Sequence, residues 1–497
     1  MQKIHVTIAS FVNQAIQLGF AQELDRVYLQ NRLIAMLDLK GFQDLGQNDL
    51  SLLENMDQMV NYAKQRGIIQ TSTSAREIFE AQIMDLITPL PSQLNQTFWE
   101  KYQESAQAAT EYFYQLSRTN DYIKTRQIAK NIIFQYESDY GCLDITINLS
   151  KPEKTTQEIA LARQMESSSY PMCALCFENE GFKGDLNHAA RTNHRLIRLE
   201  VNGEGYGLQY SPYAYFDQHC IFVHQVHQPM AINRRTFANL LAIVDRFPHY
   251  FVGSNADLPI TGGSILSHDH YQGGRHHFAM ARAKVSETYQ LADFPDLTVE
   301  HLYWPMSVIR LRHTDPKLVL DAAEMIFNHW LEYSDESLEI LAYTNGERHN
   351  TITPIARRRD KAFELDLVLR NNRTNDHYPD GIFHPHQDVQ HIKKENIGLI
   401  EVMGLAILPP RLLEELQAVK AYLKAEIPLE QVPGIHQAWA QSLKESVLHE
   451  DQSQLDDLIQ DAIGQKFQRV LEDAGVFKTD QAGQAGFQRF MDSLNAR

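Results

Sequence analysis

Segments with strand character occur in two blocks of this 497-residue chain, and helical patterns flank both blocks. In each block apolar and polar side chains alternate, which is typical of half-buried strands. We expect strands at 142–149, 194–201, 207–215, 219–223 and 307–312, and then at 350–356 and 363–370. Helices are expected at 236–247 and 316–333. This order predicts an α+β fold in which a strand-rich part occurs twice.

The two ends of the chain are predicted to be helical. In the first twenty residues Ile8, Phe11, Val12 and Ile16 fall at helical spacing, so we expect an amphipathic helix packed on the body; a signal peptide is the alternative. Farther on, Ser74 and Glu77 match a capping box before a helix at 78–87. Three regions are therefore predicted: a helical N-terminal region (1–130), a catalytic first half (131–312) and a second half with a helical tail (313–497).

Composition excludes several classes of protein. The formal net charge of −17 argues against a broad basic surface for nucleic acid. The sequence contains no 20-residue apolar run, so we expect no membrane span. Four cysteines are too few for a disulfide scaffold in a chain of this length. Without a targeting segment, we expect a cytoplasmic protein.

The strongest local signal is His268-x-His270-x-Gln272. If this segment is extended, the three side chains point to one face. A neutral imidazole is a good nucleophile toward phosphorus, and the glutamine amide can donate to a phosphoryl oxygen. The alternative is that two histidines near a turn are surface residues. The preceding Gly-Gly turn favours a phosphate-handling site.

A second signal is the pair Cys173 and Cys176, whose C-x-x-C spacing suits a tetrahedral metal ion. The other two ligands must then be histidines, and His219, His224, His227 and His268 are the candidates. We predict Cys173, Cys176, His227 and His268, with the metal orienting the His-x-His segment. A redox pair, or two thiols that only pack, are the alternatives.

Basic clusters are the third feature. They occur at 191–198, which includes Arg195, at 357–359 and at 393–394. Such clusters usually lie on a solvated face. One or two of these clusters could instead bind the phosphates of a nucleotide sugar. Arg195 and Lys394 are the candidate residues for this contact. His384 and His386 form a second His-x-His, which we interpret as a degenerate copy, a second metal site or surface residues.

Three longer motifs carry a family resemblance. Gly253–Gly274, Met172–Gly181 and His391–Gly404 strongly resemble the type 2 galactose-1-phosphate uridylyltransferases of Gram-positive bacteria. The resemblance runs from the N-terminal helices to the tail. It implies the histidine-triad superfamily, whose α+β half-barrel occurs twice in one chain.

The resemblance implies a ping-pong reaction of the Leloir galactose pathway. His270 takes the uridylyl group from UDP-glucose and passes it to galactose 1-phosphate, while Gln272 binds the transferred phosphoryl group. It implies one structural metal, zinc or iron, on the four ligands above, and no organic cofactor. The substrate-binding residues that it suggests are Asn255, Ser264, Lys394 and Glu401.

The expected partners are UDP-glucose and galactose 1-phosphate, with no nucleic acid and no membrane, and the expected assembly is a homodimer. Two other readings stay open. One is a related nucleotide phosphorylase or hydrolase that uses phosphate or water as acceptor. The other is a metal-stabilised protein that binds uridine nucleotides without turnover.

Overall fold

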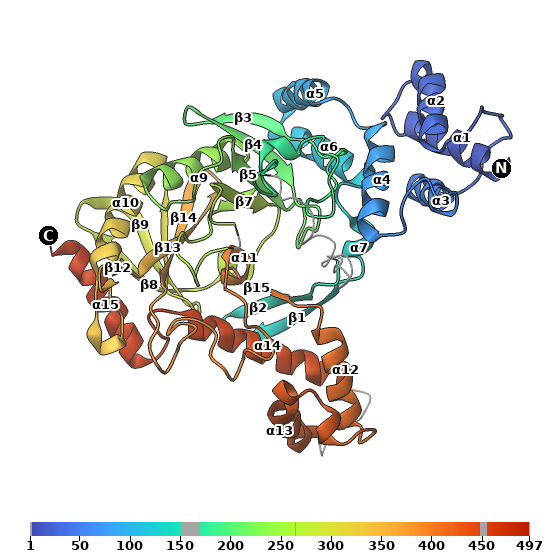
Figure 1. Cartoon of the computed structure of the whole chain (residues 1–497). Helices are drawn as coiled ribbons and strands as arrows, with labels where there is room; N and C mark the ends of the chain where they lie inside the picture. Colours follow the sequence, from blue (N-terminus) through green and yellow to red (C-terminus); the bar gives the residue numbers. More distant parts are fainter. Residues whose placement is uncertain (1, 151–168, 264, 448–454, 497) are drawn as a thin grey trace. The chain divides into compact units, whose positions relative to one another are not determined.

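The computed structural model describes residues 2–150, 169–263, 265–447 and 455–496, and the chain divides into two compact units. The first unit comprises Met1–Arg126, Lys151–Ala214 and Cys220–His227. The second comprises Gln127–Ser150, Tyr215–His219 and Gln228–Arg497. Both units combine helices with strands (Figure 1), which confirms the α+β fold class.

The N-terminal part of the first unit is a group of helices with its own apolar core. These helices are α1 (Gln2–Gln17), α2 (Arg26–Met36), α3 (Leu52–Gln65) and α4 (Thr73–Asp85). In α1 the apolar stripe predicted from the sequence is buried: Ile8, Phe11 and Val12 lie in the core and Ile16 packs against it. The predicted amphipathic helix is therefore confirmed, and its apolar face packs into the core of these N-terminal helices.

Helix α4 begins earlier than the sequence predicted. Its N-cap is Ser72, whose Oγ accepts a hydrogen bond from the Ala75 amide at 3.2 Å, and Ser74 already lies inside the helix. The predicted capping box at Ser74 is therefore wrong. Both serines precede the apolar residues, and capping at Ser72 allows the residues from Thr73 onward to join the hydrogen-bonded helix.

The rest of the first unit joins two helices to three antiparallel strands. The helices are α5 (Pro91–Glu104) and α6 (Ala106–Thr119), and the strands are β3 (Ile197–Val201), β4 (Glu204–Tyr210) and β5 (Cys220–His224). Asn95 on α5 bonds the start of β3: it donates to the Leu196 carbonyl and accepts from the Arg198 amide. The short helix α7 (Thr125–Ile128) follows α6 at the boundary of the units.

In the second unit a small sheet is formed by β1 (Ile132–Ser138), β2 (Gly141–Ile147) and β15 (Leu405–Leu408), with β1 antiparallel and β15 parallel to β2. A larger set of strands has the order β7-β6-β13-β14-β10-β9-β8. Their bounds are β6 (Phe251–Gly253), β7 (His270–Gly274), β8 (Val285–Leu291), β9 (Phe294–Leu302), β10 (Val308–His313), β13 (Asn350–Arg359) and β14 (Ala362–Asn371). Strands β11 (Tyr343–Thr344) and β12 (Glu347–Arg348) form a separate hairpin.

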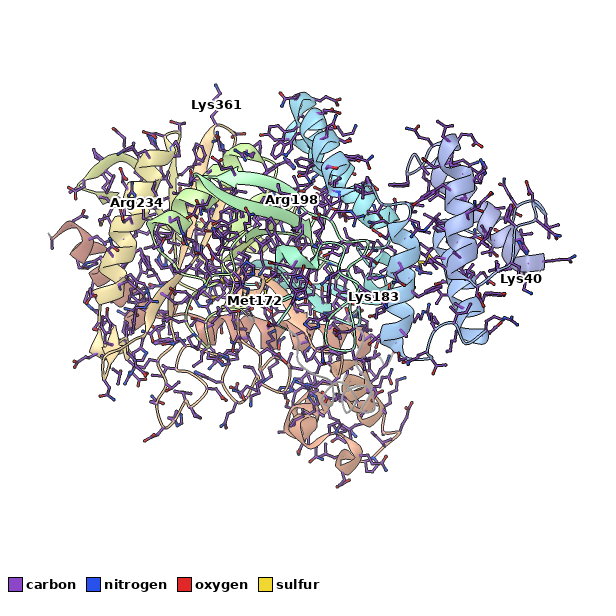
Figure 2. All side chains as sticks on the ribbon, turned by 45° about the horizontal axis from the view of Figure 1, so that its top comes forward. Lys40, Met172, Lys183, Arg198, Arg234 and Lys361 are labelled. Carbon is purple, nitrogen blue, oxygen red and sulfur yellow. The ribbon has the colours of Figure 1, made fainter. Side chains whose placement is uncertain are left out.

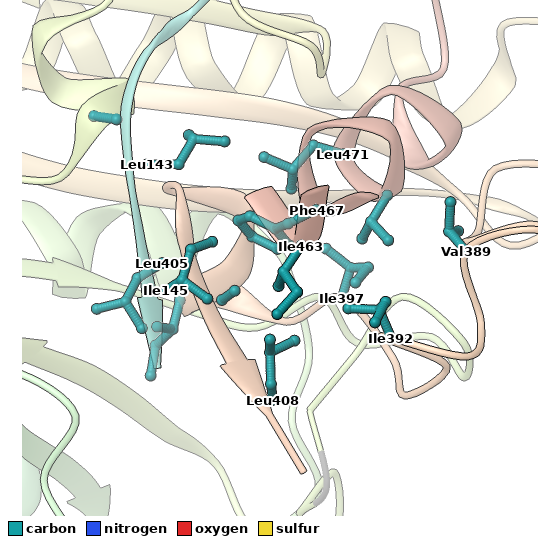
Figure 3. Packing of buried hydrophobic residues seen from close by; sticks show 14 of the residues in the cluster. Leu143, Ile145, Val389, Ile392, Ile397, Leu405, Leu408, Ile463, Phe467 and Leu471 are labelled. Carbon is teal, nitrogen blue, oxygen red and sulfur yellow. The ribbon is translucent and has the colours of Figure 1, made fainter. Parts of the chain in front are cut away.

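Helices α9 (Arg234–Arg246) and α10 (Pro316–Glu332) pack on β13 and on each other. The remaining helices are α11 (Leu399–Val402), α12 (Leu412–Leu423), α13 (Gln437–Val447), α14 (Leu455–Ala474) and α15 (Gln481–Asn495). Figure 3 shows side chains of α14, such as Phe467, meeting Leu143 of β2 and Leu405 of β15 in one apolar core. Across the described residues, no helix combines the length and the apolar character that a membrane span requires.

Candidate active site

The His268–Gln272 segment leads into strand β7, so the predicted extended conformation is present from His270 onward. Gln272 lies opposite Gly253 of β6 in the antiparallel ladder. Tyr271 points toward α9, where Asn239 donates a hydrogen bond to its hydroxyl at 3.1 Å. Because side chains alternate along a strand, His270 and Gln272 share the opposite face.

His270 is held in one tautomer by the main chain. Its Nδ1 lies 2.7 Å from the carbonyl oxygen of His268, and a carbonyl can only accept a hydrogen bond. Nδ1 therefore carries the proton, and Nε2 keeps its lone pair. The side chain is buried, and burial lowers the pKa of His270 to about 4. At neutral pH the ring is uncharged and nucleophilic at Nε2.

Gln272 has a histidine partner. His219 lies just before β5 in the sequence, and its Nε2 is 3.2 Å from Oε1 of Gln272. In the sequence, His219 is a candidate only as a metal ligand. No spacing rule relates the two residues, because they are 53 positions apart and meet only in the folded chain.

The four predicted metal ligands converge. Cys173, Cys176, His227 and His268 each offer one ligand atom, and these atoms all lie within 4.8 Å of one another. The two Sγ atoms are 3.5 Å apart, and Sγ of Cys176 is 3.2 Å from Nδ1 of His227. Two thiolates and two imidazoles in such a group match the donors that a tetrahedral zinc ion takes in structural sites.

His224, the alternative metal ligand, is engaged elsewhere. Its Nδ1 accepts a hydrogen bond from the Val226 amide at 3.0 Å, and its Nε2 is 3.5 Å from a carboxylate oxygen of Glu204. This arrangement favours His227 as the third ligand.

Two of the predicted substrate-binding residues meet at the start of α11. The Asn255 side chain accepts a hydrogen bond from the Leu399 amide at 2.8 Å. Glu401 accepts from the Gly398 amide at 3.2 Å and from Nζ of Lys393 at 3.0 Å. Both side chains therefore brace the segment that carries the third family-like motif.

The other predicted substrate-binding residues lie in different surroundings. Arg195 is buried, and its guanidinium donates to the carbonyls of Pro89 and Thr192 and to Asp85, each at 2.7 Å. Lys394 is exposed, whereas its neighbour Lys393 is buried. Ser264 lies outside the described residues.

The remaining basic clusters serve the fold. Arg198, labelled in Figure 2, is paired with Glu180. Arg357 bonds the buried carboxylates of Glu364 at 2.7 Å and Asp366 at 2.6 Å. The positive charge of these two arginines is thus neutralised by acidic partners, which lie in a turn for Arg198 and on β14 for Arg357.

The second His-x-His pair also has local partners. His386 stacks on Tyr378 with ring centroids 4.1 Å apart, and its Nε2 is 3.0 Å from the carbonyl oxygen of Ile382. His384 is buried, and burial lowers its pKa. The contacts of His386 give that ring a packing role in the second unit.

The fold and the site together define an α+β protein in which a buried, neutral histidine shares a strand with a glutamine, and in which two cysteines and two histidines form a candidate ligand group. Two family models match the chain: the galactose-1-phosphate uridyl transferase N-terminal domain over residues 20–229 and the C-terminal domain over residues 243–441. The chain belongs to the galactose-1-phosphate uridyl transferase family.

Bacterial relatives match almost the full length of the chain. A galactose-1-phosphate uridylyltransferase of Streptococcus pneumoniae (strain Hungary19A-6) is 53% identical over 492 residues, which cover 98% of this chain and 99% of the relative. One of Ligilactobacillus salivarius (strain UCC118) is 51% identical, with 98% of each chain covered. Among solved structures, the yeast Ap4A phosphorylase Apa2 matches with a TM-score of 0.36 and 10% identity, covering 65% of this chain and 96% of that one.

Proposed function

We propose that this protein transfers a uridylyl group from UDP-glucose to galactose 1-phosphate through a covalent intermediate on His270. Family membership supports the substrate pair, since the matched relatives are named for this activity. The observation that carries the mechanism is the 2.7 Å contact of His270 Nδ1 with the His268 carbonyl. It leaves Nε2 as the atom with a free lone pair.

In the first half-reaction Nε2 of His270 attacks the α-phosphorus of UDP-glucose. A P–N bond forms, the P–O bond to the β-phosphate breaks, and glucose 1-phosphate leaves with the electron pair. In the second half-reaction a phosphate oxygen of galactose 1-phosphate attacks the same phosphorus. The P–N bond then breaks, UDP-galactose leaves, and the imidazole is neutral again.

The amide NH2 of Gln272 supplies a hydrogen bond to the phosphoryl group as negative charge develops on its oxygens. Cys173, Cys176, His227 and His268 hold a structural zinc or iron ion, which fixes the position of His268 when bound. Because the His268 carbonyl orients His270, the ligand group supports the nucleophile through one residue.

We also propose that five residues contact the substrates: Asn255, Arg195, Ser264, Lys394 and Glu401. We further propose that the fold is a duplicated half-barrel and that the protein forms a homodimer. The bracing of the 398–402 segment by Asn255 and Glu401 supports a role for that segment in the site. Sedimentation measures the assembly: a homodimer has about twice the 57.2 kDa mass of the chain.

Isotope exchange tests the proposal. Labelled glucose 1-phosphate is incubated with UDP-glucose and enzyme in the absence of galactose 1-phosphate. A ping-pong enzyme incorporates the label into UDP-glucose, because the first half-reaction is reversible alone. A nucleotide-binding protein gives no exchange. A phosphorylase or hydrolase is recognised by release of UDP or UMP when phosphate or water is the acceptor.

A further inference from the structure

His219 is a buried histidine that makes one hydrogen-bonding contact to the site. It takes part in none of the proposed chemical steps. Its ring lies against Phe216, with centroids 4.5 Å apart, and against Tyr215 at 5.6 Å. Its Nε2 contacts Oε1 of Gln272 at 3.2 Å. Its Nδ1 is buried without a hydrogen-bond partner, so the polar contact that fixes the ring is the one to Gln272.

The contact constrains both side chains. An amide oxygen only accepts hydrogen bonds, so Nε2 of His219 must carry the proton. The amide oxygen of Gln272 is then turned toward His219, and its NH2 group is turned away. Burial lowers the pKa of His219 to about 4, so the ring stays neutral near pH 7.

The orientation of the Gln272 amide matters because its NH2 group carries a partial positive charge and its oxygen a partial negative charge. The NH2 end stabilises a phosphoryl oxygen, whereas the carbonyl end repels it. A glutamine with no partner samples both orientations, and only one of them stabilises the transition state.

We propose that His219 is a positioning residue: its Nε2–H holds Oε1 of Gln272, so that the amide NH2 faces the phosphoryl group on His270. This inference rests on the proposed function, in which His270 carries the uridylyl group. His219 itself touches no reacting atom in this scheme.

The kinetic test compares variants of position 219 that keep or remove a hydrogen-bond donor toward Gln272. His219→Leu removes the donor and keeps an apolar side chain beside Phe216. His219→Gln offers an amide NH2 toward Gln272. His276→Leu is the matched control, since His276 lies near the same Phe216 ring but bonds to Asp144. The measured quantities are the single-turnover rate of uridylylation, the Kd of UDP-glucose and the Tm.

We expect His219→Leu to slow uridylylation about tenfold, a fraction of the loss typical for removal of an oxyanion-hole donor. The Kd should change less than about threefold, and His219→Gln should regain most of the rate. In a Gln272→Ala background, His219→Leu should have no further effect, because the group that it positions is absent. Additive losses, or equal rates in His219→Leu and wild type, would overturn the proposal.

A measurement on the wild type keeps the proposal testable if His219→Leu does not fold. Nitrogen chemical shifts of 15N-histidine-labelled protein report the tautomer of each ring, with His219→Gln providing the assignment. The proposal requires the Nε2–H tautomer of His219; the Nδ1–H tautomer would overturn it. This result does not depend on turnover, whereas loss of isotope exchange in the wild type overturns the proposed function instead.

Discussion

His268 has two roles in one residue. Its imidazole belongs to the Cys2His2 ligand group, and its carbonyl oxygen accepts the hydrogen bond from Nδ1 of His270. A metal ion bound by the imidazole would also position the main chain of His268, so the orientation of His270 would depend on the ligand group. The ligand group is therefore expected to affect reactivity although no ligand atom reacts.

The first prediction concerns metal content. Wild-type protein should contain about one zinc or iron ion per chain, and Cys176→Ser should lose most of it because a hydroxyl is a much weaker ligand than a thiolate. Elemental analysis measures the content, and thermal unfolding measures the accompanying loss of stability. Cys142→Ser is the matched control. Equal metal content in Cys176→Ser and wild type would contradict the ligand assignment.

The second prediction concerns Gln272. Gln272→Ala should reduce the single-turnover rate by about 10² to 10³, the usual loss for a donor that stabilises transition-state charge. Gln272→Glu keeps the shape of the side chain but places a carboxylate beside the phosphoryl group, so it should be slower still. Quenched single-turnover uridylylation assays measure both rates. If Gln272→Glu reacted as fast as wild type, the proposed role of the Gln272 amide as a hydrogen-bond donor would be wrong.

At the scale of elements, the sequence predicts the buried strands best, because their apolar residues recur along the segment. The strands expected at 350–356 and 363–370 are found as β13 and β14, paired along their whole length. Helix α10 begins at the predicted Pro316. The hairpin of β8 and β9 was missed, because most residues of β8 are exposed and give no apolar alternation. Its strand character comes from pairing with β9.

Helix α14 gives a prediction about packing. Gly464 lies where a Cβ would come within 2.1 Å of Cγ of Tyr136 on β1. Alanine in place of glycine gains roughly 1 kcal/mol of helix propensity, but overpacking typically costs about 1–3 kcal/mol or more. A clash this close should dominate.

We therefore expect Gly464→Ala to lower the free energy of unfolding, measured by urea titration. Gly434→Ala is the control, since a Cβ there meets no atom within 4 Å. If Gly464→Ala were as stable as Gly434→Ala, the packing of α14 on β1 would be wrong.

At the scale of the whole molecule, buried and half-buried histidines couple stability to pH. Burial lowers the pKa of His249 and His301 to about 4 and that of His391 to about 3. In the unfolded chain these groups titrate near 6.5. Between the two values the unfolded state binds more protons, so acid favours unfolding.

The free energy of unfolding should therefore fall as the pH drops from about 6.5 toward 4. Each of these histidines contributes a slope of up to about 1.4 kcal/mol per pH unit. Urea titrations at pH 7 and pH 5 measure the difference, and His391→Leu should reduce it if the variant folds. Equal stability at the two pH values would contradict the burial of these rings.

The candidate site was predictable only in part, for physical reasons. The C-x-x-C spacing and the His-x-His-x-Gln pattern are local, so they indicated Cys173, Cys176 and His268, whereas the choice of His227 over His224 is favoured only by the folded structure. The His219–Gln272 contact depends on how separate strands are arranged, which no local pattern encodes. Two partners of Arg195, Pro89 and Asp85, likewise lie more than a hundred positions away, at the end of α4 and just after it.

Covalent labelling tests the central claim most directly. The protein is incubated with UDP-glucose radiolabelled at the α-phosphate and without acceptor, in parallel with His270→Ala and with the exposed His277→Ala as control. The account predicts an acid-labile, base-stable label on the peptide that contains His270, absent from His270→Ala, retained in His277→Ala, and released as UDP-galactose when galactose 1-phosphate is added. An unlabelled but folded wild type, or equal label on His270→Ala, would contradict it.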